Sequence, residues 1–479
     1  MLLSELLLDV QYAGSYKDCE ISGITSDSRL VKEGSVFVCI KGARFDGHEK
    51  AKEAVEKGAV CVIVQERVGV ENEILVENTR SAYALICANY YGRPAERLKL
   101  IGVTGTNGKT TITCLIKGML EYTGEKAGLI GTIQNEVDDM HFPAKYTTPD
   151  PLEPHLMFKR MADAGCKYVV MEVSSHALDQ HRLDGCRFES AIFTNLTQDH
   201  LDYHGTMENY FEAKKKLFSM CNNAIIDIDD EYGARLYEEV SCPKWSYSIK
   251  KDAADYTAYN VAFTISGSSF EMVSKGNIGR VKFCMPGEFS AANALAAGVC
   301  SLTLGMDFGE MIDALNHSKG VKGRAEILDT DTDYTIIRDY AHSPDSIEQI
   351  LKTVKGFAPG RVVILFGCAG NRDRTKRKLM AKAASDYADY VILTSDNPRD
   401  EDPERIIEDA KPGLNPKTPC KIITDRYEAI KWALKNAKKD DVLLLAGKGH
   451  EDYQALDFGT IYFDESEIVK ELLEKAEGK

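Results

Sequence analysis

The sequence predicts an α/β protein built from three domains, and three observations carry that prediction. The chain has 479 residues, which is too many for one hydrophobic core and, at roughly 100–200 residues a domain, suggests three domains. Short apolar runs alternate with helical stretches along most of the chain, as they do in mostly parallel sheets covered by helices. A glycine turn joins one such run to a helix near residue 105. We place the domains at 1–97, 98–322 and 323–479.

Composition and charge limit the kinds of partner. The formal charge is -15 at pH 7, which argues against nonspecific nucleic-acid binding, because that function needs a basic face. The 13 cysteines are scattered without a C-x-x-C pair, and this pattern fits reduced thiols in a cytosol better than disulfides or a zinc site. No apolar run reaches about 18 residues. We therefore expect a soluble, cytoplasmic protein that binds neither nucleic acid nor a membrane.

The first domain is expected to be a small α/β unit. Apolar strands are predicted at 36–40, 60–64 and 74–76, and helices at 48–57 and 81–91. Residues 25–29 read TSDSR and precede the first of these strands. Asp, Ser and Arg are ordinary turn residues when such a segment is considered alone, so a role for Ser28 depends on the rest of the chain.

The stretch 100–113, LIGVTGTNGKTTIT, predicts a P-loop-type phosphate site in the central domain. An apolar strand leads into Gly105, Thr106, Asn107 and Gly108, and Lys109, Thr110 and Thr111 open a helix. Glycines let backbone N–H groups converge on phosphate oxygens, the lysine reaches the β- and γ-phosphates, and the Thr110 hydroxyl can ligate Mg²⁺. The general motif G-x-x-x-x-G-K-[ST] needs glycine where this chain has Val103. We predict a variant loop for a nucleoside triphosphate, and a plain strand-turn-helix connection is the alternative.

Polar residues follow the other predicted strands of the central domain, which lie at 128–132, 168–173 and 190–194. Ligand groups of parallel sheets gather at the carboxyl ends of strands, and Glu172, His176 and His200 fall there. A carboxylate and an imidazole beside a phosphate loop suit Mg²⁺ that also binds nucleotide oxygens. The helix predicted at 210–218 carries a lysine run, which without further context is a solvated face.

The third domain is expected to hold a parallel, Rossmann-like sheet. Strands are predicted at 362–366, 390–394 and 442–445, with helices between them, and crossover helices of this kind connect parallel strands. The segment 367–377, GCAGNRDRTKR, lacks the dinucleotide pattern G-x-G-x-x-G. A nicotinamide cofactor is therefore not expected.

Nine motifs occur in the order in which they occur in the Mur ligases, which add amino acids to the peptide of bacterial cell-wall precursors. They are GTNGKTT (105–111), MEVSSHALDQHR (171–182), TNLTQDHLDYHG (194–205), YFEAKKKLF (210–218), NALAAG (293–298), GRAE (323–326), DYAHSPDS (339–346), DNPR (396–399) and GKGHEDYQ (447–454). The chain resembles this family nearly from end to end. DNPR and GKGHE are similar to the motifs of members that add meso-2,6-diaminopimelate to UDP-N-acetylmuramoyl-L-alanyl-D-glutamate.

The resemblance implies the family's three-domain architecture, a monomer, and a ligase reaction. Such an enzyme phosphorylates a substrate carboxylate with ATP, an amine attacks the acyl phosphate, and the tetrahedral intermediate expels phosphate to leave an amide. Positioning and charge neutralisation should supply most of the rate, because two highly charged reactants meet in one site. ATP and Mg²⁺ are the implied cofactors, and the UDP-muramoyl dipeptide and meso-diaminopimelate are the other substrates.

Residue roles follow from the family's motif positions. The ATP-binding set is Gly105, Thr106, Asn107, Gly108, Lys109, Thr110, Thr111, Asn293, Arg324, Asp339 and Tyr340, and the metal set is Thr110, Glu172, His200 and Lys214. Lys214 matches a lysine that the family carbamylates, so that CO₂ turns a cationic amine into an anionic metal ligand. His176 matches a histidine near the transferred phosphoryl group, where it stabilises the transition state. The implied catalytic residues are Lys109, His176 and Lys214.

The resemblance also implies residues for the two other substrates. The UDP-muramoyl dipeptide set is Ser28, Thr147, Thr148, Ser174, Gln180 and Arg182, and the diaminopimelate set is Arg372, Asp396, Asn397, Pro398, Arg399, Gly447 and Glu451. Diaminopimelate carries a second amino-carboxylate centre that lysine lacks, and the Arg399 guanidinium suits bidentate capture of its carboxylate. Glu451 is expected to pair with the distal ammonium. Tyr146 in place of an Asn puts one contact in doubt, and Asn371 in place of an acidic residue leaves Arg372 unaffected.

Two other functions fit part of the pattern. A folylpolyglutamate synthetase resembles this architecture and uses acyl phosphate chemistry, but the DSR segment at 27–29 and the DNPR motif argue against it. A nucleotide-dependent switch would use the phosphate loop alone, and it leaves Lys214, His200 and DNPR unexplained. Phosphate release from ATP that requires both an amino acid and a UDP-muramoyl dipeptide distinguishes these functions.

Overall fold

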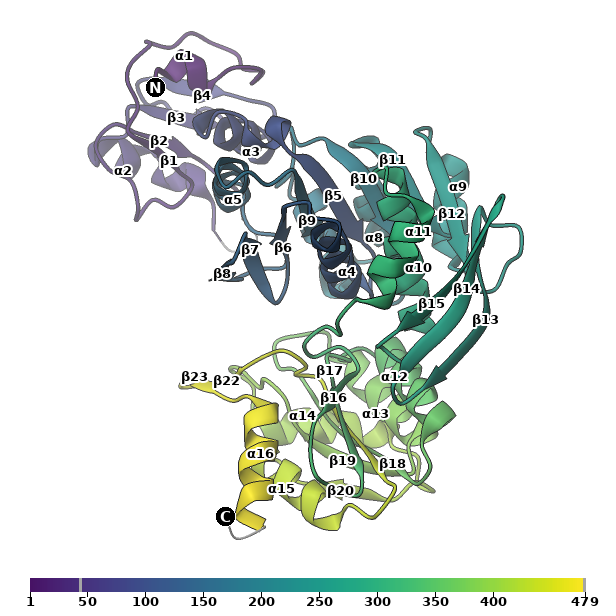
Figure 1. Ribbon diagram of the computed structural model, residues 1–479. Helices are drawn as coiled ribbons and strands as arrows, with labels where there is room; N and C mark the ends of the chain where they lie inside the picture. The colour runs from purple at the N-terminus through teal and green to yellow at the C-terminus, as the bar shows by residue number, and fades with distance from the viewer. Residues whose placement is uncertain (43–44, 477–479) are drawn as a thin grey trace. The chain divides into compact units, whose positions relative to one another are not determined.

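The computed structural model describes residues 1–42 and 45–476 (Figure 1). The chain divides into two compact units. The first unit holds Met1–Thr104, Gly124–Ala191 and Ala213–Asn223, and the second holds Gly105–Thr123, Ile192–Glu212 and the described chain from Ala224 onward. The phosphate loop therefore belongs to the same unit as the C-terminal half of the chain. Parallel strands with helices on their faces recur in both units, which confirms the predicted α/β class.

The N-terminal sheet is parallel and takes its strands in sequence order. It consists of β1 (Gly23–Thr25), β2 (Ser35–Val38), β3 (Cys61–Val64) and β4 (Glu73–Leu75). Successive residues of a strand face opposite sides, so Val36 and Val38 pack with α1 (Leu3–Leu6) and α3 (Thr79–Tyr90), whereas Phe37 packs with α2 (Ala51–Glu56). Burial on both faces explains why these strands are continuous apolar runs. The predicted small α/β unit is confirmed.

The central sheet has the strand order β15-β14-β13-β12-β11-β10-β5-β9-β6-β7-β8. Its inner strands are β5 (Lys99–Thr104), β6 (Ala127–Ile130), β9 (Tyr168–Glu172), β10 (Phe188–Phe193), β11 (Cys221–Asp227) and β12 (Lys244–Ser248). β9 pairs in parallel with both β5 and β6, and its last residue, Glu172, lies opposite Val103. This register brings the carboxyl ends of three strands to one edge, as the sequence predicts.

Antiparallel strands extend the central sheet at both edges, and the sequence reading contains none of them. They are β7 (Gln134–Val137) and β8 (Met140–Pro143) at one edge, and β14 (Gly267–Ser274) and β15 (Asn277–Phe283) beyond β13 (Tyr256–Thr264) at the other. Burial alternates along β14, where Ser268, Phe270 and Met272 are buried and their neighbours are not. A strand with one wet face has half the apolar density of a parallel inner strand, so it leaves a weaker signal.

Helices cover the central sheet. They are α4 (Lys109–Tyr122), α5 (Leu152–Asp163), α6 (Ser175–Asp179), α7 (Leu201–His204), α8 (Met207–Lys215), α9 (Glu231–Glu239), α10 (Glu288–Thr303) and α11 (Phe308–Asn316). α4 packs against α10 and α11. The helix predicted at 210–218 divides, because α8 gives way to a 3₁₀ turn at Lys216–Ser219. In the described part of the chain, every helix is too short or too polar to cross a membrane.

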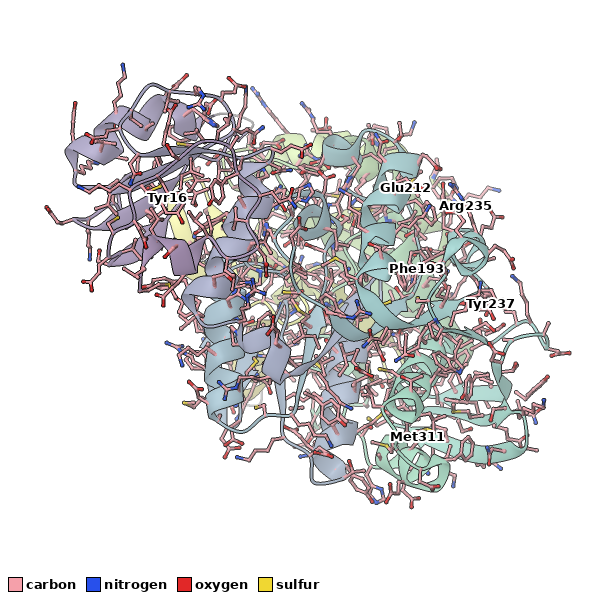
Figure 2. The ribbon with its side chains drawn as sticks, turned by 90° about the horizontal axis from the view of Figure 1, so that it is seen from above. Tyr16, Phe193, Glu212, Arg235, Tyr237 and Met311 are labelled. Atoms are coloured by element: carbon pink, nitrogen blue, oxygen red, sulfur yellow. The ribbon has the colours of Figure 1, made fainter. Side chains whose placement is uncertain are left out.

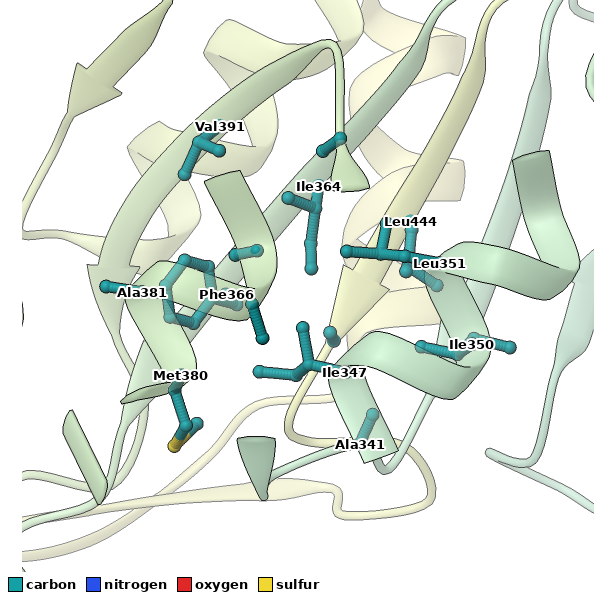
Figure 3. Close-up of a cluster of buried hydrophobic side chains, with 14 of the residues drawn as sticks. Ala341, Ile347, Ile350, Leu351, Ile364, Phe366, Met380, Ala381, Val391 and Leu444 are labelled. Atoms are coloured by element: carbon teal, nitrogen blue, oxygen red, sulfur yellow. The ribbon is translucent and has the colours of Figure 1, made fainter. Parts of the chain in front are cut away.

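The C-terminal sheet has the order β16-β17-β21-β18-β19-β20, and only the β16 and β17 pair is antiparallel. Ile364 and Phe366 of β18 face a buried cluster with α12, α13 and α14 (Figure 3), while Leu365 faces α15 and α16. Helices on both faces of a parallel sheet confirm the predicted Rossmann-like domain. The elements are β16 (Glu326–Leu328), β17 (Thr335–Asp339), α12 (Pro344–Phe357), β18 (Val362–Cys368), α13 (Thr375–Tyr387), β19 (Tyr390–Ser395), α14 (Pro403–Ala410), β20 (Cys420–Ile422), α15 (Arg426–Asn436), β21 (Val442–Ala446), the hairpin β22 (Tyr453–Leu456) and β23 (Gly459–Tyr462), and α16 (Glu465–Ala476).

Candidate active site

The phosphate loop joins β5 to α4 through two glycines with positive φ. Gly105 has φ +147° and Gly108 has φ +89°, which are conformations that side chains disfavour. A Cβ at Gly105 would lie 1.9 Å from Thr194 Oγ1, and a Cβ at Gly108 would lie 2.5 Å from Asn293 Oδ1. Both the backbone conformation and the close neighbours therefore require glycine. The second contact places the predicted ATP residue Asn293, on α10, against the loop.

Residues 194–195, which follow β10, hold the phosphate loop through three hydrogen bonds. Thr194 Oγ1 donates to Asn107 O (2.6 Å), and Asn107 N donates to Asn195 Oδ1 (2.9 Å). Thr106 N donates to Asn195 O (2.9 Å). These bonds set the loop conformation before any ligand arrives, and a prearranged phosphate cradle avoids the entropy cost of ordering it. The sequence reading assigned no role to Thr194, and its only signal is the TNLTQDH motif.

Lys109 lies over the loop that precedes it. Its Nζ donates to Gly105 O (2.9 Å) and Thr106 O (2.8 Å). The ammonium is thus held at the rim of the loop, where it can exchange these carbonyls for phosphate oxygens. Thr110 and Thr111 are buried in the first turn of α4.

Of the three predicted ATP residues at the start of the C-terminal domain, Arg324 contacts the first turn of the helix after the phosphate loop, and Asp339 and Tyr340 contact Arg324 or its turn. Arg324 Nη2 donates to Thr110 Oγ1 (2.8 Å), and the Arg324 guanidinium lies 4.7 Å from the centre of the Tyr340 ring. Asp339 accepts from Ala325 N (2.7 Å) and Ala341 N (2.8 Å), so it fixes the turn that carries Arg324. Burial raises the pKa of Asp339. Arg324 Nε is buried and has no hydrogen-bond partner among the described residues, which leaves one cationic donor for a ligand.

Asp199, to which the sequence prediction assigned no role, is a buried carboxylate in the segment after β10. Asp199 is 7% exposed and forms ion pairs with Lys376 of α13 and with His200 Nδ1 (3.7 Å). Burial alone would raise the pKa of Asp199, but the charges of His200, Lys376 and His342 hold it well below its usual range. Asp199 is therefore ionised at neutral pH. The predicted metal ligand His200 thus lies beside a permanent carboxylate.

Glu172 ends β9 as a buried carboxylate in the first unit, with 1% exposure. Thr132 holds both of its oxygens: N donates to Oε1 (2.8 Å) and Oγ1 donates to Oε2 (3.0 Å). Because Glu172 pairs in register with Val103, it lies at the end of the strand that feeds the phosphate loop. An oriented carboxylate at this place fits Mg²⁺, which takes one or two protein carboxylates and fills its other positions with phosphates and water. In the described residues no three His, Cys, Asp or Glu side chains gather into a self-sufficient metal site.

Five of the six predicted dipeptide residues, all but Ser28, form one hydrogen-bonded group beside Glu172. Thr148 Oγ1 donates to Glu172 O (2.8 Å) and accepts from Ser174 N (2.9 Å). Arg182 donates to Thr148 O (2.7 Å) and to Gln180 Oε1 (2.9 Å). The remaining contacts are Thr147 Oγ1 with Thr132 Oγ1 (3.0 Å), Arg182 with Asp150 (3.2 Å) and the Arg182 guanidinium with the Tyr146 ring (5.6 Å). Ser28 lies in the turn between β1 and β2, where its carbonyl accepts from Lys57 Nζ (3.0 Å).

Lys214 is 1% exposed and lies near the end of α8. Tyr210, one turn earlier, contacts Thr106 Oγ1 (3.3 Å) and the His200 ring (6.1 Å between centroids). Residues four apart share a helix face, so Lys214 lies on the face of α8 that carries Tyr210. On the opposite, exposed side of α8, Arg235 of α9 forms ion pairs with Glu208 (2.8 Å) and Glu212 (3.7 Å). Figure 2 shows Arg235 and Glu212. The predicted catalytic residue His176 is partly exposed on α6, whose N-cap is Ser174.

The predicted diaminopimelate residues enclose a lysine that was not predicted. Lys448 is 0% exposed, and its Nζ contacts Asn397 Oδ1 (3.0 Å), Glu451 Oε2 (3.1 Å) and Asp396 Oδ1 (3.5 Å). Asn397 Nδ2 also donates to Glu451 Oε2 (2.8 Å). Glu451 Oε1 accepts from Tyr340 (3.5 Å) and Tyr453 (3.4 Å), which connects this cluster to the ATP residues. Gly447 lies against Asp396. The signal for Lys448 was its place inside the GKGHE motif.

Two guanidiniums flank this cluster. Arg399 follows the buried Pro398 and has φ +54°, a strained conformation that its surroundings must hold. Its N donates to Ala455 O (3.0 Å) and its Nη1 donates to Gly370 O (2.7 Å). Desolvation and then repulsion from Arg399 lower the pKa of Arg372. A guanidinium is suited to bidentate binding of a carboxylate.

Comparisons with known proteins agree with this geometry. Residues 20–98 match the family description "Mur ligase family, catalytic domain", residues 103–301 match "Mur ligase middle domain" and residues 323–449 match "Mur ligase, glutamate ligase domain". The UDP-N-acetylmuramoyl-L-alanyl-D-glutamate–2,6-diaminopimelate ligase of Clostridium tetani is 44% identical over 487 residues, which cover 99% of this chain and 100% of that protein.

Two solved structures agree with the fold. A structure of a UDP-N-acetylmuramoyl-L-alanyl-D-glutamate–2,6-diaminopimelate ligase has a TM-score of 0.69 and 34% identity, with 95% of each chain covered. The MurF ligase from Thermotoga maritima in complex with ADP has a TM-score of 0.64 and 21% identity, with 94% of this chain and 97% of that chain covered.

Proposed function

The chain belongs to the Mur ligase family, and we propose on that premise that it joins meso-2,6-diaminopimelate to UDP-N-acetylmuramoyl-L-alanyl-D-glutamate. The reaction consumes ATP and forms ADP and phosphate, and its product is a precursor of peptidoglycan. ATP phosphorylates the substrate carboxylate, the amine of diaminopimelate attacks the acyl phosphate, and phosphate leaves. Relatives that carry this activity in their names are 42–44% identical to the chain, most of them over its whole length.

One observation carries the choice of amino acid. Asp396 and Glu451 share the single ammonium of Lys448, so the buried cluster keeps one negative charge. Arg399 adds a guanidinium beside it, near Tyr453, whose hydroxyl contacts Glu451. A surplus carboxylate next to a guanidinium complements an ammonium next to a carboxylate, and diaminopimelate presents that arrangement at its distal end. Lysine presents only the ammonium there.

The ATP-binding residues divide into a fixed part and a cationic part. Gly105 to Thr111 cradle the phosphates, with Asn293 behind the loop. Lys109 and Arg324 neutralise charge as it moves between the nucleotide and the acyl phosphate, and His176 does so at the transferred phosphoryl group. Asp339 and Tyr340 hold Arg324 in place.

Magnesium is assigned to two groups of residues. Thr110 and Glu172 hold one ion, and His200 and a carbamylated Lys214 hold the other; when bound, Mg²⁺ supplies neutralisation of the phosphate charge. The place of Lys214 in the YFEAKKKLF motif (210–218) supports the modification. A carbamate would replace the cationic amine with an anionic metal ligand.

Three further assignments complete the proposal. The domains are 1–97 for the UDP-muramoyl dipeptide, 98–322 for ATP and 323–479 for diaminopimelate, and the separate family matches at 20–98, 103–301 and 323–449 support these boundaries. The protein acts in the cytoplasm, which its 13 free cysteines support. We also propose that it acts as a monomer.

The test is phosphate release by the purified chain with ATP and Mg²⁺. We expect release only when the UDP-muramoyl dipeptide and meso-diaminopimelate are both present. Replacing the dipeptide with a folate and the diamino acid with glutamate should give no release, and release there would indicate a folylpolyglutamate synthetase. Release with ATP alone would indicate a nucleotide switch.

A further inference from the structure

Arg426 is buried behind the amino-acid-binding residues. It is the first residue of α15, and its Nε donates to Glu465 Oε1 (2.8 Å), the first residue of α16. Both side chains have an exposure of 0%. Buried ion pairs are often no more stabilising than apolar residues of the same volume. Stability alone therefore does not explain the pair, and its other contacts indicate a second role.

The other two nitrogens of Arg426 bind the ends of two strands. Nη1 donates to Ser395 O (3.2 Å) and Nη2 donates to Ala446 O (2.8 Å). Ser395 is the last residue of β19 and Ala446 is the last residue of β21. These strands do not pair with each other, because β18 lies between them. The planar Arg426 guanidinium therefore reaches across the end of β18 and fixes the distance between the ends of β19 and β21.

Each of the two carbonyls leads directly into the diaminopimelate set. Asp396 to Arg399 follow Ser395, and Gly447 and Lys448 follow Ala446. The two segments touch through Lys448 Nζ and Asn397 Oδ1 (3.0 Å). Within residues 1–42 and 45–476, the side-chain hydrogen bonds of Arg426 go to Glu465 and to the two strand-end carbonyls, so its influence on this set passes through the backbone.

We infer that Arg426, held by Glu465, is a positioning residue that sets the spacing of the two loops for the amino-acid substrate. The inference rests on the proposed function, since it concerns the diaminopimelate site. A lysine at 426 would keep the charge but lose the rigid fork that serves three acceptors at once. A shift of about 1 Å in a site built from two loops costs on the order of 100-fold in productive binding or rate.

The test is the kinetics of Arg426→Lys with each of the three substrates. We expect the KM for meso-diaminopimelate to rise by roughly 10- to 100-fold, while the KM values for ATP and the UDP-muramoyl dipeptide stay within about twofold. Glu465→Gln keeps an oxygen acceptor for Arg426 Nε without the charge, and we expect a smaller rise in the same KM alone.

Arg361→Lys is the matched control. Arg361 pairs with Asp441 through Nε (3.0 Å) and Nη2 (2.6 Å). Arg361 directly precedes β18 and Asp441 directly precedes β21, so the pair lies at the end of the sheet opposite to Ser395 and Ala446. This variant also exchanges an arginine fork for a lysine, but far along the strands from the loops, so all three KM values should stay unchanged.

The outcomes separate the inference from the proposed function. If the unmutated chain shows no phosphate release that depends on diaminopimelate, both the proposed function and this inference are wrong. Release in the unmutated chain, together with an unchanged diaminopimelate KM in Arg426→Lys, would overturn the inference alone. So would an equal rise in all three KM values, or a loss of active enzyme without any change in KM, because those results mark a structural residue. If Arg426→Lys fails to fold, an unchanged KM in folded Glu465→Gln overturns the inference.

Discussion

Lys376 of α13 and Asp199 of the segment after β10 form a buried ion pair, with side-chain exposures of 11% and 10%. The two residues are 177 positions apart in the sequence. The contacts of Arg324 with Thr110 and of Asn107 with Asp345 (3.0 Å) join the same two regions of the second unit. Charged contacts therefore connect the C-terminal sheet to the phosphate loop.

The first prediction concerns the cost of breaking this pair. Lys376→Met removes the nearest cation and leaves Asp199 buried, so we expect the free energy of unfolding to fall by roughly 3 kcal/mol. Asp199→Asn in the Lys376→Met background removes the unpaired charge and should recover most of the stability. Chemical denaturation of the two single variants and the double variant checks this, and three equal losses would refute it.

The second prediction concerns the phosphate loop. Lys109→Met keeps the aliphatic stem but removes the charge from the rim of the loop, so phosphate release should fall by roughly 100- to 1000-fold, on the scale of lost transition-state charge stabilisation. A purified variant that unfolds cooperatively on heating would show that the loss of activity is not a loss of fold. Lys117→Met, on the same helix and paired with Glu121, is the control and should keep its activity. Near-normal release by Lys109→Met would show that the loop has been misassigned.

The sequence predicts several inner strands of the fold, but it misses the inner strands β11, β12 and β17 and the antiparallel edges. The strands near Val103, Val170 and Ile364 are found because burial on both faces leaves continuous apolar runs. The strand β14 was not found, because its buried residues alternate with exposed ones and include Ser268. The termination of α8 at Lys215 was also missed, since a change from α-helix to 3₁₀ turn depends on tertiary contacts.

The same difference holds for the candidate site. Motif positions predict the residues that would touch ligands, such as Lys109, Arg182 and Arg399. They assign no role to Lys448, Lys376 or Thr194, which contact Asn397, Asp199 and Asn107. Thr194 and Lys448 lie inside motifs, but their contacts join segments that only the folded chain brings together, so the motifs do not show what these residues bind.

The third prediction concerns Lys214. If it is carbamylated, Lys214→Ala removes an anionic ligand, and we expect loss of most of the phosphate release with partial rescue by added acetate or another short carboxylic acid. The rescue should saturate with the acid, because a bound carboxylate replaces the missing group. Lys216→Ala, two residues on and paired with Asp179 on the surface (3.4 Å), should be active and insensitive to the acid. Full activity of Lys214→Ala without any acid would remove the assignment.

The fourth prediction concerns pH and His155 of α5. The side chain is 1% exposed, and neither ring nitrogen has a hydrogen-bond partner in the described chain. Burial lowers its pKa from 6.5 to about 4. The unfolded state therefore binds a proton more readily than the folded state. The contribution of His155 to the free energy of unfolding is fully present above pH 6.5 and falls by about 1.4 kcal/mol per pH unit as the pH drops toward 4.

The variant His155→Leu tests that window. It lacks the titrating ring, so its unfolding free energy should depend less on pH between 6.5 and 4 than that of the unmutated chain. His141→Leu removes an exposed histidine and should leave the pH dependence unchanged. Identical slopes for His155→Leu and the unmutated chain would contradict the argument.

The last prediction is specificity, and it rests on Arg399. Its guanidinium is held by Gly370 O through Nη1 (2.7 Å), so its other nitrogens can meet the distal carboxylate of diaminopimelate without a large loss of side-chain entropy. Each hydrogen bond between charged groups contributes about 1.5–3 kcal/mol, and 1.4 kcal/mol is tenfold in affinity. Arg399→Ala should therefore raise the KM for diaminopimelate by roughly one to three orders of magnitude and leave the KM for ATP nearly unchanged. Arg405→Ala removes an 84% exposed arginine of the same domain and should change neither value. Lysine should be a poor substrate of the unmutated chain; equal use of lysine and diaminopimelate would end the Arg399 argument while leaving the ligase chemistry at the phosphate loop intact.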